Sequence, residues 1–123
     1  MAYTSANLSL ATLEFFVHFE LENAENLDLT AIWAEIPDTV PMENIEIGDL
    51  PEDWKNPIAP SELAAIGDKW LQMANTAVLA VPSAITPYEC NYLLNPEHPD
   101  FVNIEIGTPE LFVLDKRMFK GRL

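Results

Sequence analysis

The chain has few cysteines, few glycines and few histidines, and each shortage excludes a kind of site. Its single cysteine, Cys90, allows no intrachain disulfide and no cysteine-based zinc site, which fits a reducing cytoplasm. The two histidines, His18 and His98, are too far apart in sequence to predict a metal site. All four glycines are isolated, so no glycine-rich loop is present to cradle a phosphate.

Long hydrophobic runs and positive charge are scarce as well. No apolar stretch approaches the ~18 residues of a membrane span, and the N-terminus lacks the basic residues of a signal peptide, so we expect a cytoplasmic protein. Six basic residues face twenty acidic ones, for a formal net charge of −14. Such a surface repels nucleic acid and anionic membranes, so we expect neither as a partner. An excess of acidic residues is typical of a solvated, soluble surface. The alternative is that the acidic surface mimics nucleic acid and binds a basic protein.

The length of 123 residues and the 49% hydrophobic content predict one domain, residues 1–123, with a packed core. One helix is expected from Asn7 to Phe19 with Ser5 as its N-cap, and a second begins at Ser61. Ala2-Tyr3 has the pattern of a strand end. Apolar patterning predicts further strands at residues 29–36, 44–47, 77–81, 101–106 and 111–114. The expected fold class is therefore α/β, with mixed α and β elements and more strands than helices.

Two polar residues in apolar surroundings are candidates for chemistry. Glu14 lies on an otherwise apolar helix, where a carboxylate is costly unless it is paired or faces a cleft; the alternative is that it faces water. His18 follows one turn later and can support Glu14 or the fold. Ser83 comes directly after a buried strand, where α/β folds assemble ligand sites, although most such serines only form turns. The absence of a G-x-S-x-G motif argues against a hydrolase nucleophile.

The segment from Asn91 to Pro99 is rich in side chains that form turns, so we expect a folded loop there. Cys90, just before it, has no adjacent cation and is expected to be a small buried hydrophobic residue.

An ordered series of motifs along nearly the whole chain resembles the RES domain family. These motifs are YTS at 3–5, LATLE at 10–14 with His18, LPEDW at 50–54, GDKWL at 67–71, VPSA at 81–84, NYLLNPEHPDF at 91–101 and FVLDKR at 112–117. The long block at 91–101, soon after Val-Pro-Ser, is the most specific of them.

The resemblance implies a toxin of a bacterial type II toxin–antitoxin system that degrades NAD, with a fold similar to ADP-ribosyltransferases. The family is named for an arginine, a glutamate and a serine. By position, Glu14 and Ser83 match the glutamate and the serine as catalytic residues, and Tyr3 matches a tyrosine that binds NAD. The arginine has no counterpart, because in the family it lies in a segment upstream of the strand ending at Tyr3. The expected fold is thus a RES fold lacking its N-terminal segment.

The resemblance also implies a chemistry. Cleavage of the nicotinamide–ribose bond develops positive charge on the ribose, which Glu14 stabilises. Ser83 orients the ribose or a phosphate, and Tyr3 stacks on nicotinamide. NAD is then the substrate, and no metal is needed. The expected protein partners are a cognate antitoxin and a second copy of the chain. Without the arginine we expect impaired catalysis, and the alternative is an inactive relative that only binds protein.

Overall fold

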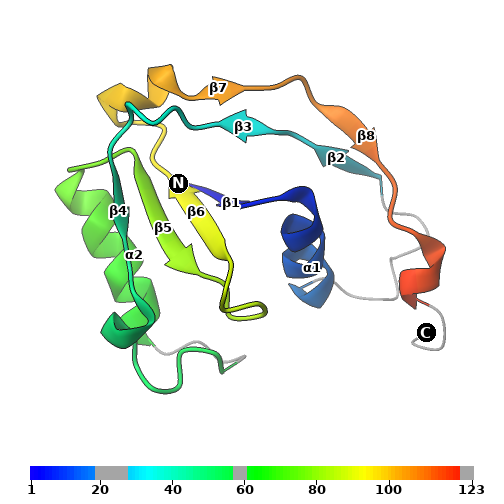
Figure 1. The fold of residues 1–123 in the computed structure, drawn as a ribbon, viewed down its shortest axis with the longest axis horizontal. Helices are drawn as coiled ribbons and strands as arrows, with labels where there is room; N and C mark the ends of the chain where they lie inside the picture. The colour runs from blue at the N-terminus through cyan, green and yellow to red at the C-terminus, as the bar shows by residue number, and fades with distance from the viewer. Residues whose placement is uncertain (19–27, 57–60, 120–123) are drawn as a thin grey trace.

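A four-stranded sheet forms the centre of the molecule. The computed structural model describes residues 1–18, 28–56 and 61–119. The strand order is β1-β6-β5-β4, with β6 antiparallel to both of its neighbours and β4 parallel to β5 (Figure 1). The strands are β1 (Ala2–Ser5), β6 (Cys90–Leu94), β5 (Val78–Pro82) and β4 (Met42–Asn44).

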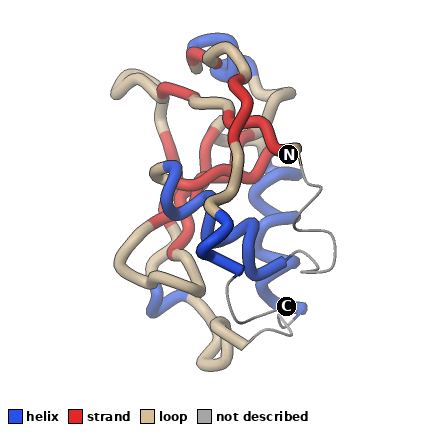
Figure 2. Tube along the Cα trace, turned by 90° about the vertical axis from the view of Figure 1, so that its right-hand side faces the viewer, coloured by secondary structure: helices blue, strands red, loops and turns tan. Residues whose placement is uncertain are grey.

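Two helices flank this sheet. Helix α2 (Ser61–Met73) packs beside β5 and β6, where Trp70 lies against Leu79 and Leu93. Helix α1 (Leu8–His18) follows β1 directly and lies at the β1 end of the sheet in Figure 1, whereas α2 lies at the β4 end. Seen from the side of α1, most of the strands lie above these two helices (Figure 2). The predicted α/β class is confirmed.

The remaining strands form two short ribbons that arch over α1 and β1 (Figure 1). β2 (Leu29–Ala31) pairs with β8 (Glu110–Phe112), and β3 (Ala34–Glu35) pairs with β7 (Glu105–Ile106). At the end of the second ribbon the N–H of Gly107 donates a hydrogen bond of 2.8 Å to the carbonyl of Trp33. We call these two ribbons the arch.

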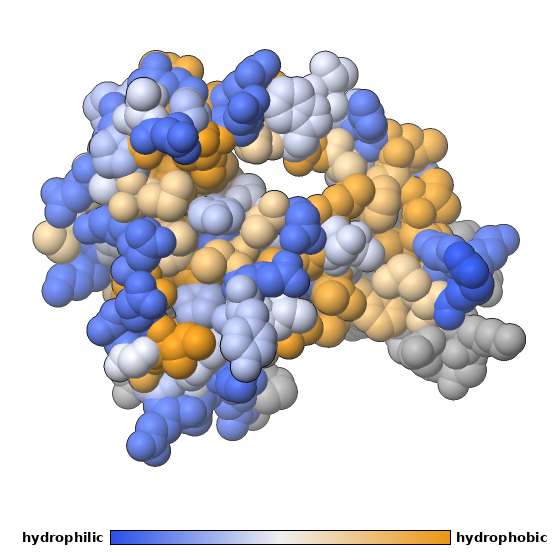
Figure 3. All heavy atoms as spheres, viewed as in Figure 1, coloured by the Kyte–Doolittle hydropathy of each residue, from blue (hydrophilic) through white to orange (hydrophobic). Residues whose placement is uncertain are grey.

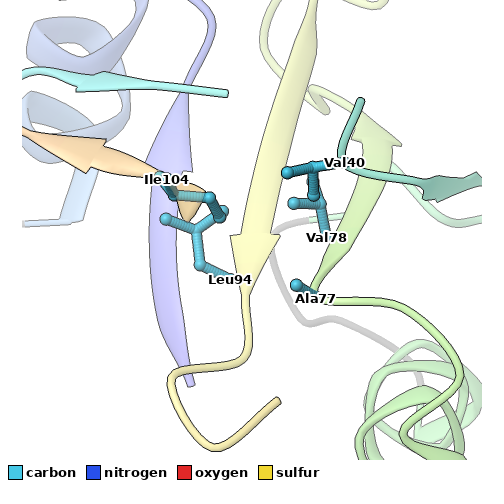
Figure 4. Packing of buried hydrophobic residues seen from close by; sticks show 5 residues of the cluster. All are labelled: Val40, Ala77, Val78, Leu94 and Ile104. Atoms are coloured by element: carbon cyan, nitrogen blue, oxygen red, sulfur yellow. The ribbon is translucent and has the colours of Figure 1, made fainter. Parts of the chain in front are cut away.

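The main core joins the arch to the sheet. Val78 and Leu94 come from the central strands, Val40 precedes β4, and Ile104 precedes β7. Figure 4 shows Leu94 and Ile104 side by side, with Val40 near Val78. Complete burial of each such side chain contributes about 1.5–3 kcal/mol to folding, so these contacts hold the arch to the sheet.

The helix predicted from Asn7 is found, but its cap differs from the prediction. Asn7, not Ser5, caps α1, because its Oδ1 accepts a hydrogen bond of 2.8 Å from the N–H of Leu10. Ser5 instead ends β1, where its side chain has a different partner. Ser61 does begin α2, while its side chain lies outside the part of the chain that the structure describes.

Several predicted strands are shorter or displaced. Residues 29–36 form two strands rather than one, because β2 and β3 pair with different partners. The strand expected at 44–47 ends at Asn44 and is followed by a 3-10 helix, Ile47–Asp49. The first half of 101–106 belongs to another 3-10 helix, Pro99–Asn103, and only Glu105–Ile106 forms a strand. The strand expected at 111–114 is Glu110–Phe112. The loop predicted from Asn91 is wrong for its first residues, which form β6.

Candidate active site

Helix α1 presents Glu14 to the end of strand β5. The hydroxyl of Ser83, one residue beyond β5, donates a hydrogen bond of 2.8 Å to Oε1 of Glu14. The structure therefore brings these two predicted site residues together, although they are 69 positions apart in the sequence. Glu14 is half-buried, so its carboxylate is neither in open solvent nor sealed in the core.

Ser83 is fully buried, with 0% of its surface exposed, and every hydrogen-bonding position of its hydroxyl is used. While the O–H donates to Glu14, Oγ accepts hydrogen bonds from the N–H groups of Ile85 at 3.1 Å and Thr86 at 3.2 Å. Its backbone N–H donates to the carbonyl of Glu89, which closes the loop after β5. The side chain expected to touch a ligand thus touches Glu14 and its own loop.

Asn91 is the residue that the sequence analysis missed. It lies in β6, is 1% exposed, and its Nδ2 donates hydrogen bonds to Glu14 Oε1 at 2.8 Å and to the Tyr3 hydroxyl at 3.0 Å. Its Oδ1 accepts a hydrogen bond of 2.8 Å from the hydroxyl of Ser5. The sequence feature that points to Asn91 is its position as the first residue of the longest RES-like motif. The turn-forming side chains of that block predict a loop, in which a buried asparagine is not expected.

Tyr3 lies on β1; the residue is 61% exposed, and its hydroxyl accepts a hydrogen bond from Asn91. The pKa of Tyr3 is raised above its ordinary value of 10.0. Partial burial of the hydroxyl is the larger cause and the negative charge of Glu14 the next, while the hydrogen bond from Asn91 acts in the opposite direction. Tyr3, Asn91, Glu14 and Ser83 therefore form one connected group, which we call the Glu14 network.

The two carboxylate oxygens of Glu14 differ in their hydrogen bonding. Oε1 accepts two hydrogen bonds, from Ser83 and Asn91, whereas Oε2 accepts none from the described residues. No ion pair in that part of the chain involves Glu14. The side chain of His18, the expected supporter of Glu14, lies outside the described residues.

A cleft of about 790 Å³ separates the arch from β1 and α1. The space-filling view shows it as an opening beneath the arch (Figure 3). Its walls are mainly apolar, and no lysine or arginine is among the described residues that line it. Its lining includes the aromatic residues Tyr3, Phe15, Trp33, Tyr92 and Phe112 and the apolar residue Ile32. Glu14 and Ser83 are not part of the lining, so Tyr3 is the member of the Glu14 network that borders the cleft.

Other kinds of site find little support within residues 1–18, 28–56 and 61–119. No group of three or more His, Cys, Asp or Glu side chains is placed to hold a metal ion there. None of the helices described is long and apolar enough to cross a membrane. Cys90 is half-buried.

The fold and the site define a mixed α/β domain in which buried polar groups converge on one glutamate. The chain belongs to the RES domain family, whose profile matches residues 1–115. This finding confirms the family that the motifs predicted.

Proteins similar to this chain are named as toxins. It is 33% identical over 121 residues to "Toxin Res" of Photorhabdus laumondii, an alignment that covers 98% of this chain and 76% of the relative. It is 34% identical over 125 residues to the "Prs ADP-ribosylating toxin" of a Sphingobium species, covering 98% and 75%. "Toxin Res" of Yersinia enterocolitica is 32% identical over 117 residues, covering 94% and 76%.

Proposed function

We propose that this chain is a toxin that cleaves the nicotinamide–ribose bond of NAD, with Glu14 as its catalytic residue. The observation that carries this proposal is the asymmetry of the carboxylate. Oε1 is fixed by Ser83 and Asn91, and Oε2 has no partner among the described residues. A fixed carboxylate with one open oxygen is suited to bind a ribose hydroxyl and to stabilise a neighbouring positive charge.

In the proposed reaction the bond between ribose C1′ and the nicotinamide nitrogen breaks, and its electron pair leaves with nicotinamide. Positive charge then develops on the ribose, and the Glu14 carboxylate lowers the energy of that state. An acceptor, either water or a group on another protein, then forms the new bond to C1′ and loses a proton. Ser83 acts as a positioning residue in this proposal, because its buried hydroxyl holds Glu14.

Tyr3 and the cleft supply the binding surface for NAD in this proposal. The exposed ring of Tyr3 offers a face on which nicotinamide can stack, and its hydroxyl is two hydrogen bonds away from Glu14 through Asn91. Trp33 and Phe15 line the same cleft and add apolar contacts. NAD therefore enters as substrate, and no step of the proposed reaction needs a metal.

Charge makes the proposed reaction slow in this protein. The NAD diphosphate carries negative charge, the protein carries −14, and the described lining of the cleft holds no basic side chain. The name of the Sphingobium relative refers to ADP-ribosylation of Prs, so a protein acceptor is one form that the reaction can take. We propose an antitoxin as the protein partner that restrains such a toxin.

One observation favours a second candidate function, that of a protein-binding module without catalysis. β1 is an edge strand of the sheet, so one of its sides is open to pair with a strand from another chain. The apolar cleft lies beside that edge. An antitoxin segment or a second copy of this chain fits such a surface, and neither use requires Glu14.

Saturation-transfer NMR with NAD tests whether Tyr3 and the cleft bind NAD. We expect transfer to the nicotinamide protons in the wild-type chain and its loss in Tyr3→Ala. Tyr88→Ala is the matched control, because Tyr88 is fully exposed and does not line the cleft. Equal transfer in both variants contradicts the proposed role of Tyr3, and no transfer in the wild type favours the protein-binding module.

A further inference from the structure

We propose that Asn91 is a positioning residue that fixes Glu14 and Tyr3 relative to each other, so that nicotinamide and ribose meet both groups at once. This inference rests on the proposed function. The Arg-Glu-Ser signature of the family does not include Asn91. The positioning role is inferred from the location of the Asn91 amide in the structure. Asn91 is buried between β1 and β5, opposite Ser5 on one side and Val81 on the other.

The orientation of the Asn91 amide is dictated by its neighbours. The ionised Glu14 carboxylate can only accept hydrogen bonds, so the Asn91 atom facing it must be the NH₂ nitrogen. The other N–H of that nitrogen points to the Tyr3 hydroxyl, and the Ser5 hydroxyl donates to the amide oxygen. All three contacts are 3.0 Å or shorter, and a flipped amide would place its oxygen against the carboxylate.

The chemistry of the site allows few other residues at position 91. Aspartate has the same shape but would set a second carboxylate against Glu14, and like charges at that distance disfavour the ionised form of both. A leucine or alanine would remove both donors and leave Glu14 held by Ser83 alone. Only an amide supplies two donors on one nitrogen while its oxygen accepts from Ser5.

A positioning role has a consequence for rate. Two donors on Oε1 restrict the rotation of the Glu14 carboxylate and thereby fix the position of Oε2. Loss of one donor lets the side chain move, and misplacement of a catalytic group by about 1 Å can cost about 100-fold in rate. A residue that merely fills space would cost stability without this loss.

The test compares Asn91→Asp with Asn95→Asp, measuring nicotinamide release from NAD across pH. Asn95 is a matched control: it is also a buried asparagine at the end of β6, but its Oδ1 accepts from the N–H of Glu97 and an aspartate keeps that bond. For Asn91→Asp we expect release at least about 10-fold slower, with the acidic limb of the pH profile moved to higher pH. For Asn95→Asp we expect the wild-type profile.

A second readout needs no turnover. In Asn91→Asp the Tyr3 hydroxyl loses a donor and gains a nearby negative charge, so we expect its pKa to rise further in an absorbance titration. If Glu14→Gln abolishes release but Asn91→Asp keeps the wild-type rate, pH profile and Tyr3 titration, the positioning role is overturned and the proposed function stands. If Glu14→Gln releases nicotinamide at the wild-type rate, the proposed function fails first.

A milder variant keeps the proposal testable if Asn91→Asp does not fold. Ser5→Ala removes only the hydroxyl that orients the Asn91 amide and leaves Glu14 untouched. We expect several-fold slower release in a fully folded protein. Release at the wild-type rate from Ser5→Ala would contradict the proposed role of Asn91.

Discussion

At the scale of single residues, Glu14 depends on partners that are distant in sequence. Ser83 and Asn91 follow it by 69 and 77 positions, and each contributes one hydrogen bond to the same oxygen. Tyr3 is joined to the pair through Asn91. The properties of any one member should therefore change when another is altered, and two such changes can be measured without NAD.

Glu14→Gln should lower the pKa of Tyr3 toward its ordinary value of 10.0. The negative charge of Glu14 is one of the causes that raise the Tyr3 pKa, and glutamine removes that charge while keeping the size of the side chain. The measurement is an ultraviolet absorbance titration, with Tyr3→Phe identifying the transition that belongs to Tyr3. An unchanged Tyr3 transition in Glu14→Gln would show that the charge of Glu14 does not affect the Tyr3 hydroxyl.

The same shift predicts a pH dependence of stability. Because the folded state raises the pKa of Tyr3, it favours the neutral phenol. The resulting stabilisation is present below pH 10.0 and is lost as the pH rises through the raised pKa. Tyr3→Phe should lack this particular loss.

Ser83→Ala should destabilise the fold by about 1–3 kcal/mol. The substitution leaves the N–H groups of Ile85 and Thr86 without their buried acceptor and removes one donor from Glu14. Urea unfolding measures the change, with Ser9→Ala as the exposed control on α1, expected within about 0.5 kcal/mol of wild type. Equal stability of the two variants would contradict the hydrogen bonding described for Ser83.

At the scale of elements, the arch depends on a close approach between Gly107 and Trp33. A Cβ at position 107 would overlap the Trp33 indole, so the tryptophan must move if any other residue is placed there. Gly107→Ala should therefore loosen the β3–β7 ribbon and cost about 1–3 kcal/mol in thermal unfolding. Gly48→Ala is the control, because nothing lies within 4 Å of its added methyl group. Equal melting temperatures for the two variants would contradict this packing.

Elements with a strong local pattern were predictable from the sequence. The apolar run at 77–81 is a buried strand, α2 begins at the predicted Ser61, and α1 begins one residue after the predicted Asn7, although Ser5 is not its cap. β6 was missed because Asn91 and Asn95 resemble turn residues, while the strand is stabilised by pairing with β1 and β5 that no local pattern reveals. The division of residues 29–36 has the same origin, since two different partners determine it.

Part of the site was predictable for a different reason. The apolar surroundings of Glu14 and the strand-end position of Ser83 identified both residues as candidates, and the resemblance to the RES family implied that both act on NAD. The burial of Ser83 and the contribution of Asn91 depend on how β5 and β6 are placed around α1. Such contacts between distant segments cannot be derived from spacing along the chain.

At the scale of the whole molecule, strong negative charge coexists with an open edge strand and an apolar cleft. We expect self-association that strengthens with salt, because screening weakens the repulsion between two acidic copies. Light scattering at several salt concentrations measures it. Ile32→Lys, within the cleft, should weaken association, whereas Val102→Lys, exposed elsewhere, should not. A monomer at high protein concentration and high salt would contradict this expectation.

The central claim is that Glu14 promotes cleavage of the nicotinamide–ribose bond, and single-turnover release of nicotinamide tests it most directly. Protein is held in excess over NAD, so that weak binding does not hide the chemical step. We predict slow release above the rate in buffer from the wild-type chain and from Glu105→Gln, an exposed carboxylate on the arch outside the cleft lining. Release from Glu14→Gln should be at least about 10-fold slower. Equal release from the wild type and Glu14→Gln would contradict the account.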